Sequence, residues 1–250
     1  MIRIIKKDLN LLFHSKSFYF GFIFLTGFSF LIPYAAISFE PSDSYDPFFV
    51  SWSTIIFITT ILCTSIFGLT IINKENKQGF IKNVAGMFSN RGLFAISKFI
   101  TITIAVILWI VFGLCASILT THLFADNIAY TDFSHFVYMS LLGILLNVST
   151  ISVMIFLTVL TRSSIPGVVA GIIICTNVFQ TLLSGINYLA NKIFGADNLA
   201  IEKFIPYENI SLLGYEPAND DALRAIIVAI IFIVVFNILS VIVSNKRDIK

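Results

Sequence analysis

The sequence predicts an all-α membrane protein with six transmembrane helices in a single domain over residues 1–250. Only 12% of its residues are charged and 57% are hydrophobic, whereas a soluble domain carries about 25% charged residues. Six apolar stretches each reach the roughly 20 residues that a helix needs to cross a hydrocarbon core of about 30 Å. In order, these stretches are Phe18–Ile37, Trp52–Asn73, Phe99–Thr121, Phe136–Leu160, Gly167–Ala190 and Ala225–Ser244.

The charges between these stretches predict that both chain ends are cytoplasmic. Lys and Arg near span ends favour the inner side of a membrane, and with this topology 13 of the 16 basic residues are internal while Lys192, Lys203 and Arg224 are external. Acidic residues show the opposite bias, since only Asp8, Glu75 and Asp248 are internal. The internal basic residues are Arg3, Lys6, Lys7, Lys16, Lys74, Lys77, Lys82, Arg91, Lys98, Arg162, Lys246, Arg247 and Lys250.

Residues 1–17 come before the first span and predict an interfacial helix over Ile2–Lys16. Apolar residues recur at helical spacing on one side, and polar residues fill the other, which suits a helix lying in the cytoplasmic headgroup region. Two roles stay open: an anchor for the first span, or a lever that contacts a cytoplasmic partner. The apolar set is Ile2, Ile5, Leu9, Leu12 and Phe13, and the polar set is Arg3, Lys7, Asn10 and His14.

Local features mark the first and fifth spans and the connection before the sixth. Pro33 predicts a kink or the outer end of the first span. Gly167 and Gly171 form a G-x-x-x-G pattern, extended backwards by Ser163, that favours close helix packing in lipid, either within the subunit or between subunits. The external segment 188–223 mixes acidic with apolar residues, which predicts short helices packed on the outer mouth of the bundle.

The spans contain no carboxylate or histidine that could serve ion coupling or catalysis. Proton-driven transporters and intramembrane enzymes need such groups, so both classes are disfavoured and no catalytic residue is expected. The neutral amides are interpreted as interhelical hydrogen-bond partners, with a substrate pathway as the alternative. These amides are Asn147, Asn177, Gln180, Asn187 and Asn237.

No metal or nucleotide site is expected in this chain. Cys63, Cys115 and Cys175 lie inside predicted spans and are interpreted as free apolar thiols. The loop residues His122, Asp126, Asp132 and His135 match no compact ligand spacing, so a solvated loop is favoured over a metal site. The sequence lacks a G-x-x-x-x-G-K-[ST] motif for ATP and a basic surface with interleaved aromatic residues for nucleic acid.

The internal connection 74–98 carries a pattern that resembles the coupling segment of ABC-2-type permeases. In that family an acidic residue precedes a Gly, a Lys follows three residues later, an Arg twelve residues later, and a Lys seven beyond the Arg. Glu75, Gly79, Lys82, Arg91 and Lys98 fall on these positions. Phe80, Phe88 and Asn90 depart from the family's usual residues. An ordinary basic loop would explain the Lys and Arg residues, but it would not explain Glu75 and Gly79 in this register.

The resemblance implies the permease subunit of an ABC exporter in a bacterial cell membrane. The coupling residues Glu75, Gly79, Lys82, Phe88 and Arg91 would contact an ABC ATPase subunit, which would hold the ATP and Mg²⁺. The chain itself would need no cofactor and would pair with a second permease copy, identical or homologous. Its substrate would be an amphipathic or hydrophobic molecule, a peptide or toxin. The alternative is a non-transport membrane sensor or assembly partner in a peptide-resistance system.

The predicted topology can be tested by cysteine labelling of a variant that lacks the native cysteines. A Cys introduced at Asp43 or Asp220 should react with an impermeant reagent added to intact cells, because both positions are external in this topology. A Cys at Lys77 should react only after permeabilisation. Labelling of Lys77→Cys in intact cells would contradict the assignment of the charged segments.

Overall fold

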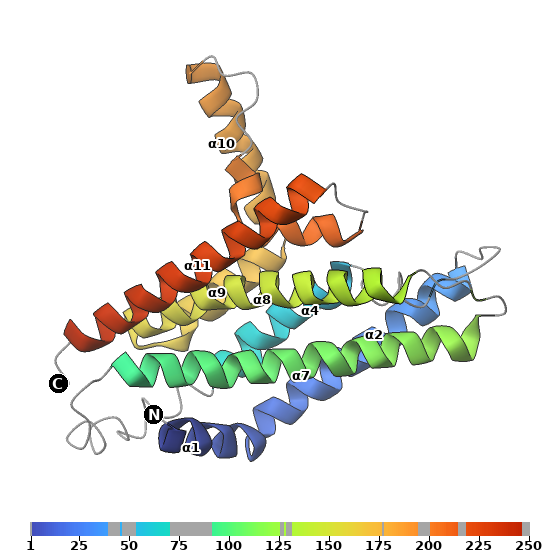
Figure 1. The fold of residues 1–250 in the computed structure, drawn as a ribbon, viewed down its shortest axis with the longest axis horizontal. Helices are drawn as coiled ribbons and strands as arrows, with labels where there is room; N and C mark the ends of the chain where they lie inside the picture. The colour runs from blue at the N-terminus through green and yellow to red at the C-terminus, as the bar shows by residue number, and fades with distance from the viewer. Residues whose placement is uncertain are drawn as a thin grey trace.

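A computed structural model of the chain describes residues 2–39, 46, 54–70, 92–125, 128, 132–176, 178–194, 201–214 and 219–246. Within these residues all secondary-structure elements of four or more residues are helices. Most of these helices run side by side in one bundle (Figure 1). Residues Glu75, Gly79, Lys82, Phe88, Arg91 and Asn177 lie outside this described part of the chain.

Four helices are long and apolar enough to cross a membrane, and they correspond to the first, third, fourth and sixth predicted spans. They are α2 (Lys16–Phe39), α7 (Gly92–Phe124), α8 (Phe133–Thr161) and α11 (Asn219–Lys246). The chain is therefore a multi-pass helical membrane protein. Pro33 does not mark the end of the first span, because α2 continues past it to Phe39.

Two shorter apolar helices complete the bundle. α4 (Thr54–Cys63) continues directly into the π-helical segment η1 (Thr64–Gly68), and α9 (Ser164–Cys175) has only 12 residues. At 1.5 Å per residue, α9 is about 18 Å long, well short of a 30 Å hydrocarbon core. α9 contacts both α4 and η1, so the two short helices pack together inside the bundle.

The prediction of one continuous helix over Gly167–Ala190 is wrong. α9 ends at Cys175, and Thr176 adopts an extended conformation with φ −93° and ψ 144°. The Thr176 hydroxyl donates to the carbonyl of Ile173 at 3.0 Å, a local bond of the kind with which Thr side chains compete against helix continuation. The chain then turns into α10 (Val178–Phe194), which points away from the bundle (Figure 1).

The segment after α10 returns the chain to the bundle through two short 3-10 helices, η2 (Ile201–Phe204) and η3 (Glu208–Gly214). η3 lies against α4 and α8, and its Ile210 and Leu213 are buried in the main core. Burial, with Cys175 and Glu208 nearby, raises the pKa of Tyr207 to about 12. The phenol is therefore neutral at physiological pH where it packs against this core.

The interior contains two apolar cores that share α7. The larger joins α4, α8, η3 and α11 to α7, and α11 lies along α8 for much of its length. The smaller lies where α2 and the N-terminal helix α1 (Ile2–Phe13) meet α7, around Trp109. There the rings of Phe18 and Trp109 stack with centroids 5.7 Å apart. α7 therefore takes part in both cores of the bundle, as α4 does through Cys63.

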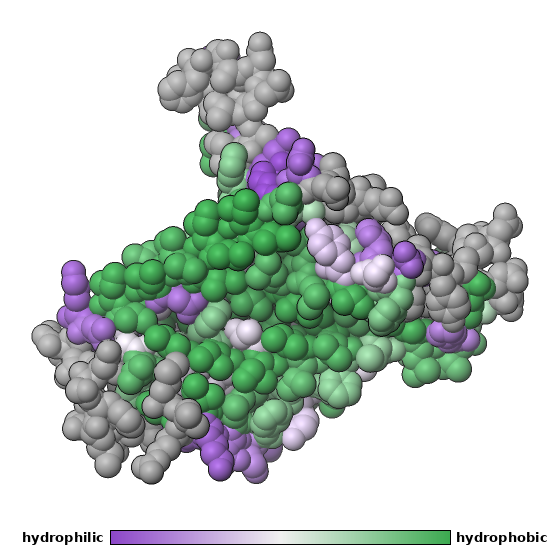
Figure 2. All heavy atoms as spheres, in the orientation of Figure 1, coloured by the Kyte–Doolittle hydropathy of each residue, from purple (hydrophilic) through white to green (hydrophobic). Residues whose placement is uncertain are grey.

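The outer surface of the bundle is apolar, as lipid contact requires. In the face drawn in Figure 2, hydrophobic residues cover most of the bundle and hydrophilic residues gather mainly near its ends. Large apolar side chains are more than half exposed on α2, α8 and α11, among them Ile23, Leu141 and Ile227. In water such a surface would aggregate, whereas in a bilayer it faces acyl chains.

Several buried threonine hydroxyl groups donate to backbone carbonyls of their own helices. Thr60, Thr64 and Thr158 are fully buried, and each donates to the carbonyl four residues earlier at 2.8–2.9 Å. An unsatisfied polar group in hydrocarbon costs several kcal/mol, on the order of the full loss of a hydrogen bond. These intrahelical bonds therefore allow polar residues to fill small spaces between spans without a water molecule.

The glycine pattern of the fifth predicted span faces the interior of the same chain. A Cβ added to Gly171 would lie against Ser65, 2.8 Å from its Oγ, and one added to Gly167 would lie 2.7 Å from Leu69 Cδ1 and 2.9 Å from the Met154 carbonyl oxygen. Both glycines are buried. They allow α9 to approach η1 and α8 more closely than any larger residue would permit.

The close approach at Gly171 predicts a large effect of substitution. Gly171→Leu adds four carbons where Ser65 and Met154 already leave no space, and overpacking of this kind typically costs about 1–3 kcal/mol. The thermal midpoint of the detergent-solubilised protein should fall. Gly27→Leu is the matched control, because a Cβ at Gly27 meets no atom within 4 Å among the described residues. Equal midpoints for the two variants would contradict the packing described here.

Candidate coupling site

The N-terminal helix α1 packs against the first turns of α7, beside the point where the predicted coupling segment ends. Among its described side chains, Ile4, Asp8 and Leu12 are buried, and their spacing of four places them on one face of the helix. Phe13, predicted on the apolar face, is 40% exposed. α1 is also shorter than predicted, since it ends at Phe13 and α2 begins at Lys16.

The buried face of α1 carries a charge that is paired across the interface. Lys98 Nζ donates to Asp8 Oδ1 at 2.9 Å, and Ser97 Oγ donates to Asp8 Oδ2 at 2.5 Å. Asp8 is 2% exposed and Lys98 is 8% exposed. Both carboxylate oxygens therefore have partners on α7. Lys7 Nζ, at 4.0 Å from Asp8 Oδ1, adds a second positive charge near the solvent edge.

Lys98 was predicted to end a cytoplasmic connection, whereas in the structure it belongs to α7. α7 begins at Gly92, seven residues before the predicted start of the third span at Phe99. The extra two turns carry Ser97 and Lys98 onto the face that α1 covers. Of the residues that match the family's coupling pattern, Lys98 is thus the one that the structure describes, and it links the end of that segment to α1.

A second helix holds the start of α7. Asn245, in the last turn of α11, accepts a hydrogen bond on Oδ1 from the backbone N–H of Gly92 at 2.7 Å. The first N–H groups of a helix have no partner within it, so such a side chain supplies a cap. α1 and the end of α11 therefore meet at the same end of the bundle, both in contact with the beginning of α7.

Of the predicted pathway amides, the structure describes the side chains of Asn147, Asn187 and Asn237. Asn147 is fully buried, and its Nδ2 donates to the carbonyl of Gly143, 3.0 Å away in the same helix. Asn237 likewise donates to Ile233 of its own helix at 2.7 Å, so these bonds are not interhelical as expected. Asn187 is buried on α10, and the side chain of Gln180 lies outside the described part.

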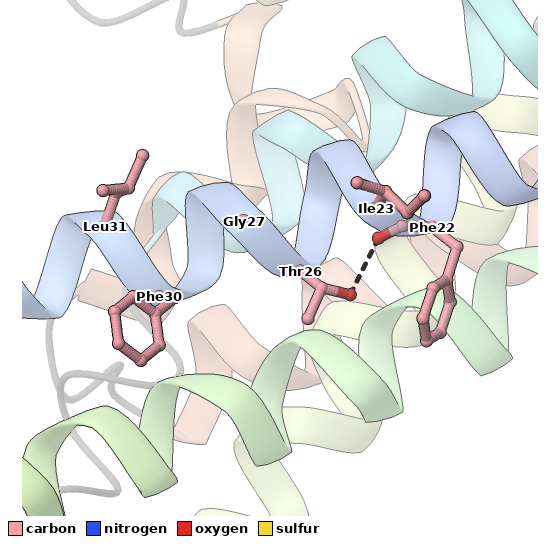
Figure 3. Close-up of a pocket in the computed structure, with 6 residues that line it drawn as sticks. All are labelled: Phe22, Ile23, Thr26, Gly27, Phe30 and Leu31. Carbon is pink, nitrogen blue, oxygen red and sulfur yellow. Dashed lines mark hydrogen bonds between the residues drawn. The ribbon is translucent and has the colours of Figure 1, made fainter.

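One face of α2 forms a shallow, open apolar groove. Figure 3 shows that its residues belong to successive turns of this one helix, with the Thr26 hydroxyl turned back to the carbonyl of Phe22 at 2.7 Å. Gly27 leaves a gap between the larger side chains. The lining residues are Phe22, Ile23, Thr26, Gly27, Phe30 and Leu31.

Sequence reasoning missed the Asp8 cluster and the Asn245 cap. The signal for Asp8 was available: it is an acid placed one turn after Ile4 and one turn before Leu12, on an otherwise apolar stripe. A charge in that position requires a buried partner. The partner could not be located from the sequence, because Ser97 and Lys98 are about 90 residues away along the chain.

Comparison with known proteins identifies the family to which this architecture belongs. The family described as ABC-2 family transporter protein matches residues 12–178, about two thirds of the chain. The chain belongs to the ABC-2 transporter family. It is therefore the membrane component, or permease, of an ABC transporter, which works with an ABC ATPase subunit and is generally not catalytic itself. A search of curated proteins finds no match.

Proposed function

We propose that this permease exports an amphipathic or hydrophobic peptide from a bacterial cell, driven by ATP that a separate ABC ATPase hydrolyses. Residues 74–98 would dock on the ATPase, which holds the ATP and Mg²⁺. ATP-driven closure of the ATPase would displace this segment and shift the bundle between inward-facing and outward-facing states. The permease would provide the conformational change and the substrate pathway, and the ATPase would provide ATP hydrolysis.

The family match over residues 12–178 is the observation that carries this proposal, because it includes the whole predicted coupling segment. The described residues that follow the segment support the same role. α7 begins at Gly92, directly after Arg91, and its first turns are held by Asp8 from α1 and by Asn245 from α11. A displacement of the segment would act on a part of the bundle that is firmly connected to two other helices.

An amphipathic cargo is the substrate class that we propose for this chain. A pathway lined by apolar side chains and neutral amides would hold the apolar face of a peptide without selecting one arrangement of charges. Within the family, the chain resembles permeases that export or give immunity to amphipathic peptides, such as the phenol-soluble modulin exporter permease. We therefore propose peptides of that class as the substrate.

The assembly would contain two permease copies and two ATPase copies, with both permease termini in the cytoplasm. The common location of α1 and the end of α11 at the start of α7 supports a shared side of the membrane for the two termini. The internal position of 13 basic residues supports it independently. The ATPase and the charged ends of the helices would then lie on the same side of the membrane.

Charge reversal in the coupling segment tests the proposed contact with the ATPase. Glu75→Lys and Arg91→Glu should leave insertion and expression unchanged, because neither residue belongs to a predicted span. Placing a like charge at a docking surface costs up to several kcal/mol of affinity. The reversed subunits should therefore retain less ATPase on co-purification and stimulate its hydrolysis less.

Lys192→Glu is the matched control, because Lys192 is an exposed residue near the end of α10. It should behave as the wild type in both measurements. If both internal reversals match this control, residues 74–98 are an ordinary basic loop. If the wild-type chain retains no ATPase at all and co-purifies instead with a sensor kinase, the alternative role as a sensor partner is favoured.

A further inference from the structure

We infer that Asp8, Ser97 and Lys98 form the joint that makes α1 and the first turns of α7 move as one body. These three residues position the helices and contact no substrate. The inference deepens the proposed function, on which it rests for the source of the movement. Displacement of the coupling segment would reach α7 at Gly92, pass to α1 through this joint, and continue into α2.

The joint lies at the start of α7, which a displacement of the coupling segment would reach first. Ser97 and Lys98 follow the start of α7 by less than two turns. Asp8 lies near the middle of α1, and its two carboxylate oxygens bind one α7 residue each, at 2.5 and 2.9 Å. Two bonds to adjacent residues fix the rotation of α1 as well as its distance from α7, which one bond would not do.

The connection from α1 to α2 is short and hydrogen-bonded. Between Phe13 and Lys16, the N–H of Ser15 donates to the carbonyl of Leu12 at 3.0 Å, and the N–H of Phe18 donates to the carbonyl of Ser15 at 3.0 Å. Leu12 and Phe18 share a buried cluster with Trp109 of α7. A shift of α1 would therefore be transmitted to the beginning of α2, because the connection between them is short and hydrogen-bonded.

The ionic character of the joint determines how it can open. Apolar contacts such as those of Ile4 and Leu12 are non-directional. An ion pair in a low-dielectric site is lost as a unit, because separation leaves two uncompensated charges. The ion pair Asp221–Arg224 joins no two helices, because both residues belong to α11. It is also not buried, since its side chains are 39% and 26% exposed.

The first experiment measures the joint in the full-length permease without its ATPase. Spin labels replace Lys6 on α1 and Val111 on α7, both exposed, in a protein whose native cysteines are changed to Ala. The distance between them is measured in lipid nanodiscs for the wild type, Asp8→Asn, Lys98→Met and the double variant. Asp221→Asn is the matched control, because it breaks the exposed ion pair.

The wild type and the control should show one narrow distance. Each single variant should show a second, longer distance whose population is about tenfold above its level in the wild type, because each variant removes one of the two charges that hold α1 on α7. In the double variant, the population of the longer distance should rise by less than the product of the two single-variant increases. Single variants identical to the wild type would overturn the inference, and so would a double variant in which the two effects simply multiply.

The second experiment adds the ATPase and separates the inference from the proposed function. In the wild-type complex the distance between the labels should stay constant when ATP is added, because α1 and α7 move together. In Asp8→Asn it should change with ATP while the ATPase still co-purifies. An equal change in the wild type would overturn the joint. Failure of the wild type to bind any ABC ATPase would contradict the proposed function, while the first experiment would still decide the inference.

Discussion

The structure depends on how buried polar groups find partners inside the protein, because hydrocarbon offers no hydrogen-bond partners. Small hydroxyl residues meet this constraint by bonding to their own helix, as Thr60 and Thr158 do, so they can lie between spans at little cost. A charge cannot be satisfied in this way and needs an opposite charge from another element. Asp8 and Lys98 meet that need, and in doing so they determine how α1 sits on α7.

The same constraint gives α7 its central place. Its apolar side chains join both cores of the bundle, and its first turns receive Asp8 from α1 and Asn245 from α11. A helix connected in this manner transmits a displacement at its start to the elements packed around it, since close-packed interiors deform little. For a permease driven by a separate ATPase, the residues before Gly92 are therefore an effective place for the ATPase to act.

Much of this architecture could be predicted from the sequence, because four spans are apolar runs bounded by charges, and hydrophobic length alone locates them. The break at Thr176 could not be predicted, because the residues on both sides are apolar enough to continue a helix. The direction of α10 could not be predicted either, because it depends on tertiary packing. The Asp8 cluster was hidden because its members are distant in sequence. The function of Glu75, Gly79, Lys82, Phe88 and Arg91 stays a prediction, as these residues lie outside the described part of the chain.

Transport by inverted membrane vesicles tests the central claim most directly. Vesicles containing the permease and its ATPase would be incubated with a fluorescent amphipathic helical peptide, with and without ATP. The account predicts that the peptide accumulates inside these vesicles only when ATP can be hydrolysed, because their interior corresponds to the outside of the cell. Accumulation that is independent of ATP, or ATP-driven uptake by right-side-out vesicles alone, would contradict an ATP-driven exporter.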